Sequence, residues 1–124
     1  MITCPDCTPA QQYVLEQLQT RAEVTDKTAL AVLLGNIEQE SNFRPKVCEG
    51  GAIVPYDQCL RGGYGLVQWT SKHRYDGLGT FCKQWRCDPS SLEGQTRYMI
   101  NEMEFRDDLH AFQLKHQTVE YYMN

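Results

Sequence analysis

Three close pairs of cysteines constrain this chain of 124 residues most, because bridges within them would fix three short stretches of backbone. Six cysteines allow several connectivities, and pairing between sequence neighbours is the simplest. Each bridge would contribute roughly 2–4 kcal/mol to stability. The neighbouring pairs are Cys4 with Cys7, Cys48 with Cys59, and Cys82 with Cys87.

Two other uses of these cysteines stay open on the sequence. The Cys4-Pro5-Asp6-Cys7 stretch has the spacing of a zinc-ligand pair, and buried unpaired thiols are a third interpretation. A second pair of this kind is missing, and His73, His110 and His116 are scattered. The sequence therefore predicts disulfides, and it predicts neither a metal nor another cofactor.

Composition and charge restrict the class of protein. A charged fraction of 23% and a hydrophobic fraction of 41% indicate a globular chain, and its length fits one domain. The net charge of −4 argues against nucleic acid as a partner. No apolar run reaches the ~20 residues of a membrane span, so no membrane insertion is expected. The N-terminus lacks the pattern of a signal peptide, and disulfides without one favour export by another route, such as a virus particle.

Capping signals and apolar periodicity predict a mainly helical chain. Thr8 and Gln11 form a capping box around Pro9, which is favourable at the first helical position. Gly77 and Gly79 should weaken the third helix. The expected helices are 8–22, 25–41, one from Ser71, one from Asp88-Pro89, and a last stretch from about Asp107 to Tyr122.

The segment from Pro45 to Gly65 is rich in glycine and has few apolar periods. It predicts a loop or a small β-hairpin, and long loops in small domains often carry function. The expected fold class is therefore α+β, mainly α, in a single domain covering residues 1–124.

Glu40 is the first candidate catalytic residue. It lies three residues after Ile37 and seven after Leu33, which predicts that it shares their apolar helix face. Burial of a carboxyl disfavours its charged form and raises its pKa, as a general acid near neutral pH requires. A solvated glutamate at a frayed helix end is the alternative that periodicity alone leaves open. Glu38 should face solvent.

Two motifs resemble the catalytic half of the lysozyme superfamily. Glu40-Ser41-Asn42-Phe43 is similar to the stretch around the catalytic acid of animal lysozymes. Tyr64-Gly65-Leu66-Val67-Gln68 is similar to the segment on the sheet side of their cleft. The likeness is greatest to the phage tail lysozyme family, where a Glu-Ser helix end and a Gly-x-Gly-Leu-x-Gln-Trp-Thr segment occur together. It covers residues 30–75 strongly.

This resemblance implies a lysozyme-like fold, a helical bundle with a small hairpin or loop as the cleft wall, and a general-acid role for Glu40. Tyr64 and Trp69 could stack on sugar faces, although core packing accounts for Trp69 equally well. Family members usually continue beyond residue 124, so the chain could be excised from a longer one. The predicted substrate-binding residues are Asn36, Ser41, Tyr64, Gly65, Gln68, Trp69 and Thr70.

The second catalytic carboxylate of animal lysozymes is missing, because Gly63 occupies its position. Asp57 and Glu49, both in the 48–59 loop, are candidates to activate water as in an inverting enzyme. Solvated loop charges are the alternative for both. A single-acid mechanism, as in goose-type lysozymes and transglycosylases, also stays open.

The function implied is a muramidase, a glycoside hydrolase that cleaves the β-1,4 bond between N-acetylmuramic acid and N-acetylglucosamine in peptidoglycan. The alternatives are a lytic transglycosylase that yields 1,6-anhydro products and a non-catalytic wall-binding virion module. The expected location is a phage tail acting at the host cell wall, with other tail or baseplate proteins as further candidate partners.

Overall fold

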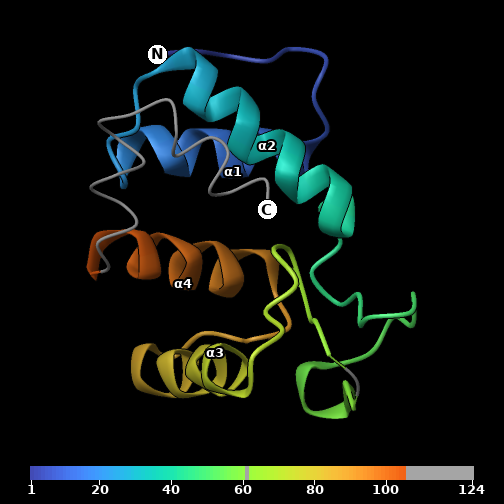
Figure 1. Ribbon diagram of the computed structural model, residues 1–124. Coiled ribbons are helices and arrows are strands. Elements are labelled where there is room, and N and C mark those ends of the chain that lie inside the picture. Colours follow the sequence, from blue (N-terminus) through green and yellow to red (C-terminus); the bar gives the residue numbers. More distant parts are fainter. Residues whose placement is uncertain (61, 106–124) are drawn as a thin grey trace. The chain divides into compact units, whose positions relative to one another are not determined.

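The computed structural model describes residues 1–60 and 62–105, apart from the side chains of residues 104 and 105. Four α-helices and one short 3-10 helix form within this part of the chain (Figure 1). The predicted mainly helical class is confirmed, whereas the stretch predicted from Asp107 to Tyr122 lies outside the described residues. The elements are α1 (Pro9–Thr20), α2 (Lys27–Ser41), η1 (Tyr56–Gln58), α3 (Lys72–Trp85) and α4 (Leu92–Phe105).

Side-chain caps define where α1 and α3 begin. Thr8 accepts a hydrogen bond from the Gln11 backbone N–H at 3.2 Å, and the Gln11 side chain accepts from the Thr8 N–H at 2.9 Å. This is the predicted capping box. Ser71 caps α3 by accepting from the Arg74 N–H at 3.2 Å. Both starts were therefore readable from the sequence.

α3 continues through its two glycines. A side chain on Gly79 would place Cβ 2.6 Å from the Tyr56 hydroxyl, and one on Gly77 would collide with the Tyr98 hydroxyl. These glycines lower the helix propensity but allow two tyrosines to approach the helix backbone closely. The two glycines that were predicted to weaken this helix therefore lie where Tyr56 and Tyr98 contact it.

The start predicted for the fourth helix was wrong by about three residues. Asp88 accepts a hydrogen bond from the Ser90 N–H at 2.8 Å, and the Asp88 carbonyl accepts from the Ser91 N–H at 3.0 Å. These bonds close a turn, so α4 begins only at Leu92. Ser91 then caps it through the Gly94 N–H at 2.9 Å.

The three cysteine pairs are bridged between sequence neighbours, as predicted. The Cα–Cα distances are 5.4 Å for Cys4–Cys7, 5.5 Å for Cys48–Cys59 and 4.5 Å for Cys82–Cys87. One bridge closes the loop after α2 and another joins α3 to the residues that follow it. The two cysteines with zinc-ligand spacing bind each other.

The segment between α2 and α3 contains a minimal β element. Three isolated antiparallel bridges join Val47 to Ile53, Cys48 to Tyr64, and Tyr64 to Trp69. Of the two predicted forms, hairpin or loop, the loop is the better description of these residues (Figure 1).

The described chain divides into two compact units. Among the described residues, the first contains 1–38 and 100–105, and the second contains 39–99. Buried side chains of the first include Leu18, Leu30 and Ile37; those of the second include Leu66 and Leu78. The expectation of a single domain over 1–124 stays a prediction. No helix in the described ranges is both long and apolar enough to cross a membrane.

Candidate active site

The last turn of α2 is bonded to the glycine-rich segment that contains the second motif. The Ser41 hydroxyl donates a hydrogen bond of 2.8 Å to the carbonyl of Leu66, and both residues are buried. This bond joins two motifs that are 25 residues apart in sequence. Ser41, predicted to bind substrate, therefore has an internal partner.

Gln95 on α4 holds the other side of the same segment. Its Oε1 accepts from the Leu66 N–H at 2.9 Å, and its Nε2 donates to the carbonyls of Pro45 at 2.7 Å and Pro89 at 2.9 Å. The side chain is 0% exposed. Sequence reasoning missed Gln95, although its position four residues before the core residue Met99 was a usable signal.

Gln68 and Thr70 also form internal hydrogen bonds. The Gln68 amide donates to the Val47 carbonyl at 3.1 Å and to the Gly65 carbonyl at 2.9 Å, which uses both of its protons. Thr70 donates to the Gln68 carbonyl at 2.8 Å, and its side chain is exposed. Only the Oε1 of Gln68 and the lone pairs of Thr70 remain for a ligand.

The two rings expected to stack on sugars lie in the core. Tyr64 and Trp69 are both 0% exposed. Tyr64 packs edge-on against Tyr56 and Tyr75, and Trp69 lies 5.4 Å from the ring centre of Tyr98. A fully buried ring has no face for a ligand, so stacking on these rings does not fit the structure, and the core-packing interpretation of Trp69 does.

Glu40 is exposed at the end of α2, so the expectation that it lies on the apolar face was wrong. On a helix, Ser41 is about 40° from Ile37 and Glu40 about 60° from it on the other side. Ser41 takes the inward position and is 2% exposed. The Glu40 carboxylate has no hydrogen bond to any residue that the structure describes.

Glu49 lies against the position where animal lysozymes have their second acid. Its backbone N–H donates to the Gly63 carbonyl at 2.8 Å, and its carboxylate accepts from the Gly63 N–H at 3.3 Å. A side chain on Gly63 would bring Cβ within 2.8 Å of Gln68 Oε1. An acid at residue 63 would therefore crowd the Gln68 side chain, whereas the Glu49 carboxylate lies beside this turn and bonds to its backbone.

Asp57 lies on η1, beside a cluster formed by Tyr56, Tyr64 and Tyr75. Tyr56 and Tyr75 stack with ring centres 4.4 Å apart, and the Tyr56 hydroxyl donates to the Tyr75 carbonyl at 2.5 Å. Burial, followed by the neighbouring Tyr75, raises the pKa of Tyr56 to about 12. Burial also raises the pKa of Tyr75, with Asp57 as the next cause. The two candidate carboxylates, Glu49 and Asp57, therefore have different surroundings.

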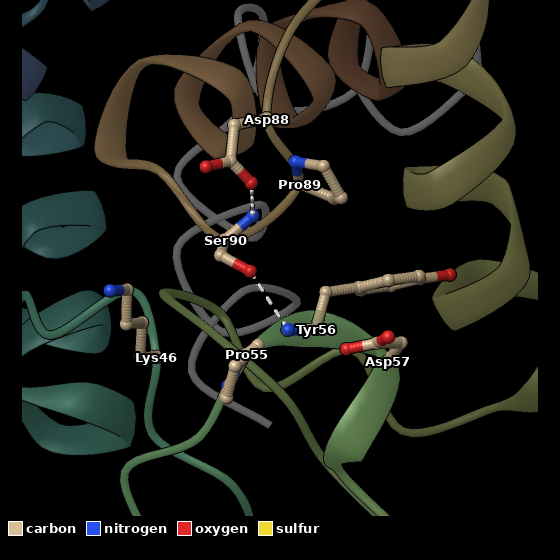
Figure 2. A pocket seen from close by; sticks show the side chains of 7 residues that line it. All are labelled: Lys46, Pro55, Tyr56, Asp57, Asp88, Pro89 and Ser90. Carbon is tan, nitrogen blue, oxygen red and sulfur yellow. Dashed lines mark hydrogen bonds between the residues drawn. The ribbon is translucent and has the colours of Figure 1, made fainter.

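A pocket of about 460 Å³ opens beside Asp57 (Figure 2). Its wall is fixed by a hydrogen bond of 2.8 Å from the Tyr56 N–H to the Ser90 hydroxyl oxygen. Its lining comes from three separate stretches of the chain: Lys46, Pro55 to Asp57, and Asp88 to Ser90.

Two remaining predicted residues have simpler surroundings. Asn36 is half-buried one turn before Glu40 on α2. Gly65 has a positive φ of 81°, and its N–H donates to the Val47 carbonyl at 2.9 Å, so it shapes the turn. Within the described residues, no group of three or more His, Cys, Asp or Glu side chains is placed to hold a metal ion.

A mainly helical fold, in which the helix end that carries Glu40 is joined through Ser41 to a glycine-rich segment, is consistent with a lysozyme-like protein. The phage tail lysozyme family matches residues 10–123, so the chain belongs to this family. Membership indicates a peptidoglycan-degrading, lysozyme-type activity in general and an association with phage tails. Comparisons with curated proteins and with solved structures give no match.

Proposed function

We propose that this protein is a muramidase that hydrolyses the β-1,4 bond between N-acetylmuramic acid and N-acetylglucosamine, with Glu40 as the general acid. The observation that carries the proposal is the bond of 2.8 Å between Ser41 and the Leu66 carbonyl. It fixes the residue next to Glu40 against the segment that resembles the cleft wall of lysozymes.

The exposure of Glu40 fits a group that must reach a polymeric substrate. A general acid has to be protonated before it can donate to the glycosidic oxygen. A bound glycan would remove water from the carboxyl, and desolvation favours its neutral form. Substrate binding would then exclude the water that surrounds this exposed side chain in the free protein.

Glu49 is the better candidate for the second carboxylate. It is held on Gly63, and Glu40 is held through Ser41 on Leu66, so both are anchored to one short segment. An inverting enzyme requires roughly 6.5–9.5 Å between its two carboxylates, which leaves room for the attacking water.

Product analysis tests this proposal. Purified peptidoglycan is digested with the wild-type protein and with the variants Glu49→Gln and Asp57→Asn, and the released muropeptides are identified by mass spectrometry. We expect reducing N-acetylmuramic ends. Glu49→Gln should lower the rate by about 10²-fold or more as a lost general base, and Asp57→Asn should lower it much less.

Two results would contradict the proposal. A dominant 1,6-anhydro product would show that the reaction is transglycosylation and not hydrolysis. Equal rates for Glu49→Gln and the wild-type protein would remove Glu49 from the mechanism.

A further inference from the structure

The pocket in Figure 2 has an unusual set of charges. Lys46, Asp57 and Asp88 line it, and all three side chains are exposed. Within the described residues, the one ion pair joins Lys72 to Asp76 on α3, so none of these three charges is neutralised by an ion pair. The pocket thus offers a cation and two anions to a ligand.

Hydrogen bonds also hold the wall of the pocket. The Val54 N–H donates to the Lys46 carbonyl at 2.9 Å, and Ser90 is bonded to both Tyr56 and Asp88 at 2.8 Å. Gln95 fixes the residues that precede Lys46 and Ser90 through the carbonyls of Pro45 and Pro89. A preformed wall lowers the ordering cost of binding. Its volume of about 460 Å³ lies within the range of small-ligand sites.

The aromatic wall is less suited to a sugar than to a charged ligand. One face of Tyr56 is covered by Tyr75 at 4.4 Å, and Tyr64 packs edge-on against the ring at 5.8 Å. At most one face of the Tyr56 ring is therefore open for a sugar to stack on. A neutral sugar would also leave Lys46, Asp57 and Asp88 without counter-charges.

We propose that this pocket binds a zwitterionic amino-acid residue, with its ammonium group on Asp57, its carboxylate on Lys46, and the charge of Asp88 adding to the attraction for the ammonium group. In Figure 2, Lys46 and Asp57 stand at opposite sides of the bonded pair Ser90 and Tyr56, as two opposite ligand charges require. The inference rests on the proposed function. Peptidoglycan carries peptide stems on its muramic acid, and a stem trimmed so that it ends in an un-cross-linked diamino acid presents both charges on that residue.

The test is an NMR titration of the ¹⁵N-labelled protein with the tripeptide L-Ala-γ-D-Glu-L-Lys, whose last residue has a free amine and a free carboxylate. The expected result is millimolar binding, with the largest shifts at the amides of Tyr56 and Ser90. The matched control ligand is the same tripeptide with an acetylated side-chain amine and an amidated C-terminus, and it should bind at least about tenfold more weakly.

Protein variants locate the interaction. Asp88→Asn keeps the oxygen that accepts from the Ser90 N–H but removes the charge, and it should weaken binding about fivefold. Lys46→Gln should do the same. The control is Asp76→Asn, which removes an exposed carboxylate on α3 that is paired with Lys72, and it should leave binding unchanged. Dispersed spectra of each variant show that it is folded.

Three results would overturn the inference: no shifts at Tyr56 and Ser90, equal binding of the blocked tripeptide, or undiminished binding by both Asp88→Asn and Lys46→Gln. Larger shifts at these amides with N-acetylglucosamine oligomers would overturn it too, by making the pocket a sugar site. Glycan cleavage is measured separately, so failed peptide binding and a failed muramidase function give different results.

Discussion

The hydroxyl of Ser41 and the carbonyl of Leu66, 2.8 Å apart, join the helix end that carries Glu40 to the glycine-rich segment. Both residues are buried, so the carbonyl has no access to bulk water. A buried carbonyl that loses its partner keeps its full desolvation cost. The bond therefore stabilises the unit and also fixes where Glu40 emerges.

Ser41→Ala should lower the free energy of unfolding by about 1–3 kcal/mol. Urea denaturation measures the change. Thr20→Ala is the matched control, because its hydroxyl donates at 2.9 Å to a helix carbonyl on an exposed surface and its loss should cost less than about 0.5 kcal/mol. If both substitutions lower the free energy of unfolding equally, the buried Ser41 bond contributes no more to stability than an exposed one.

Substitutions that remove the polar groups of Gln95 and Thr96, two neighbouring residues of α4, should have opposite effects on the free energy of unfolding. Gln95→Leu removes three hydrogen bonds and leaves three backbone groups without partners, so unfolding should become easier by about 3 kcal/mol or more. Thr96 is also 0% exposed, but its hydroxyl has no partner among the described residues.

Thr96→Val should therefore be neutral or stabilising, since it replaces an unpaired buried hydroxyl with a methyl group of similar size. Denaturation of both variants under identical conditions gives the comparison. A loss of 2 kcal/mol or more for Thr96→Val, as an order of magnitude, would indicate a partner for this hydroxyl.

Much of the fold was predictable because its signals are local. The Thr8 capping box and the Ser71 cap act within one helical turn, and neighbouring cysteines pair over short loops. The burial of Tyr64 was not predicted, and that of Trp69 was one of two equal interpretations, because both depend on packing against α3 and α4, which follow them in the chain. Glu40 shows the limit of periodicity, since the adjacent Ser41 takes the inward position through a bond to a residue 25 positions away.

The tyrosine cluster predicts a loss of stability at high pH. Burial raises the pKa of Tyr56 from 10.0 to about 12, so the folded state holds this proton more tightly than the unfolded state. Its stabilising contribution is fully present below about pH 10 and is lost as the pH rises toward about 12.

Thermal unfolding at a series of pH values, together with tyrosinate absorbance, measures this effect. Tyr56→Phe should flatten the decline between about pH 10 and 12. If the stability of Tyr56→Phe falls as steeply as that of the wild-type protein in that pH range, the loss of stability does not come from Tyr56.

The most direct test of the account compares Glu40→Gln with Glu38→Gln in an assay of muropeptide release from purified peptidoglycan. Both glutamates are exposed on α2, and two residues place them about 200° apart around the helix axis. We predict that the Glu40→Gln variant releases muropeptides about 10²–10⁴-fold more slowly than the wild-type protein and unfolds at the same urea concentration. Glu38→Gln should keep nearly full activity. Near-normal release by a folded Glu40→Gln variant would contradict the general-acid role of Glu40.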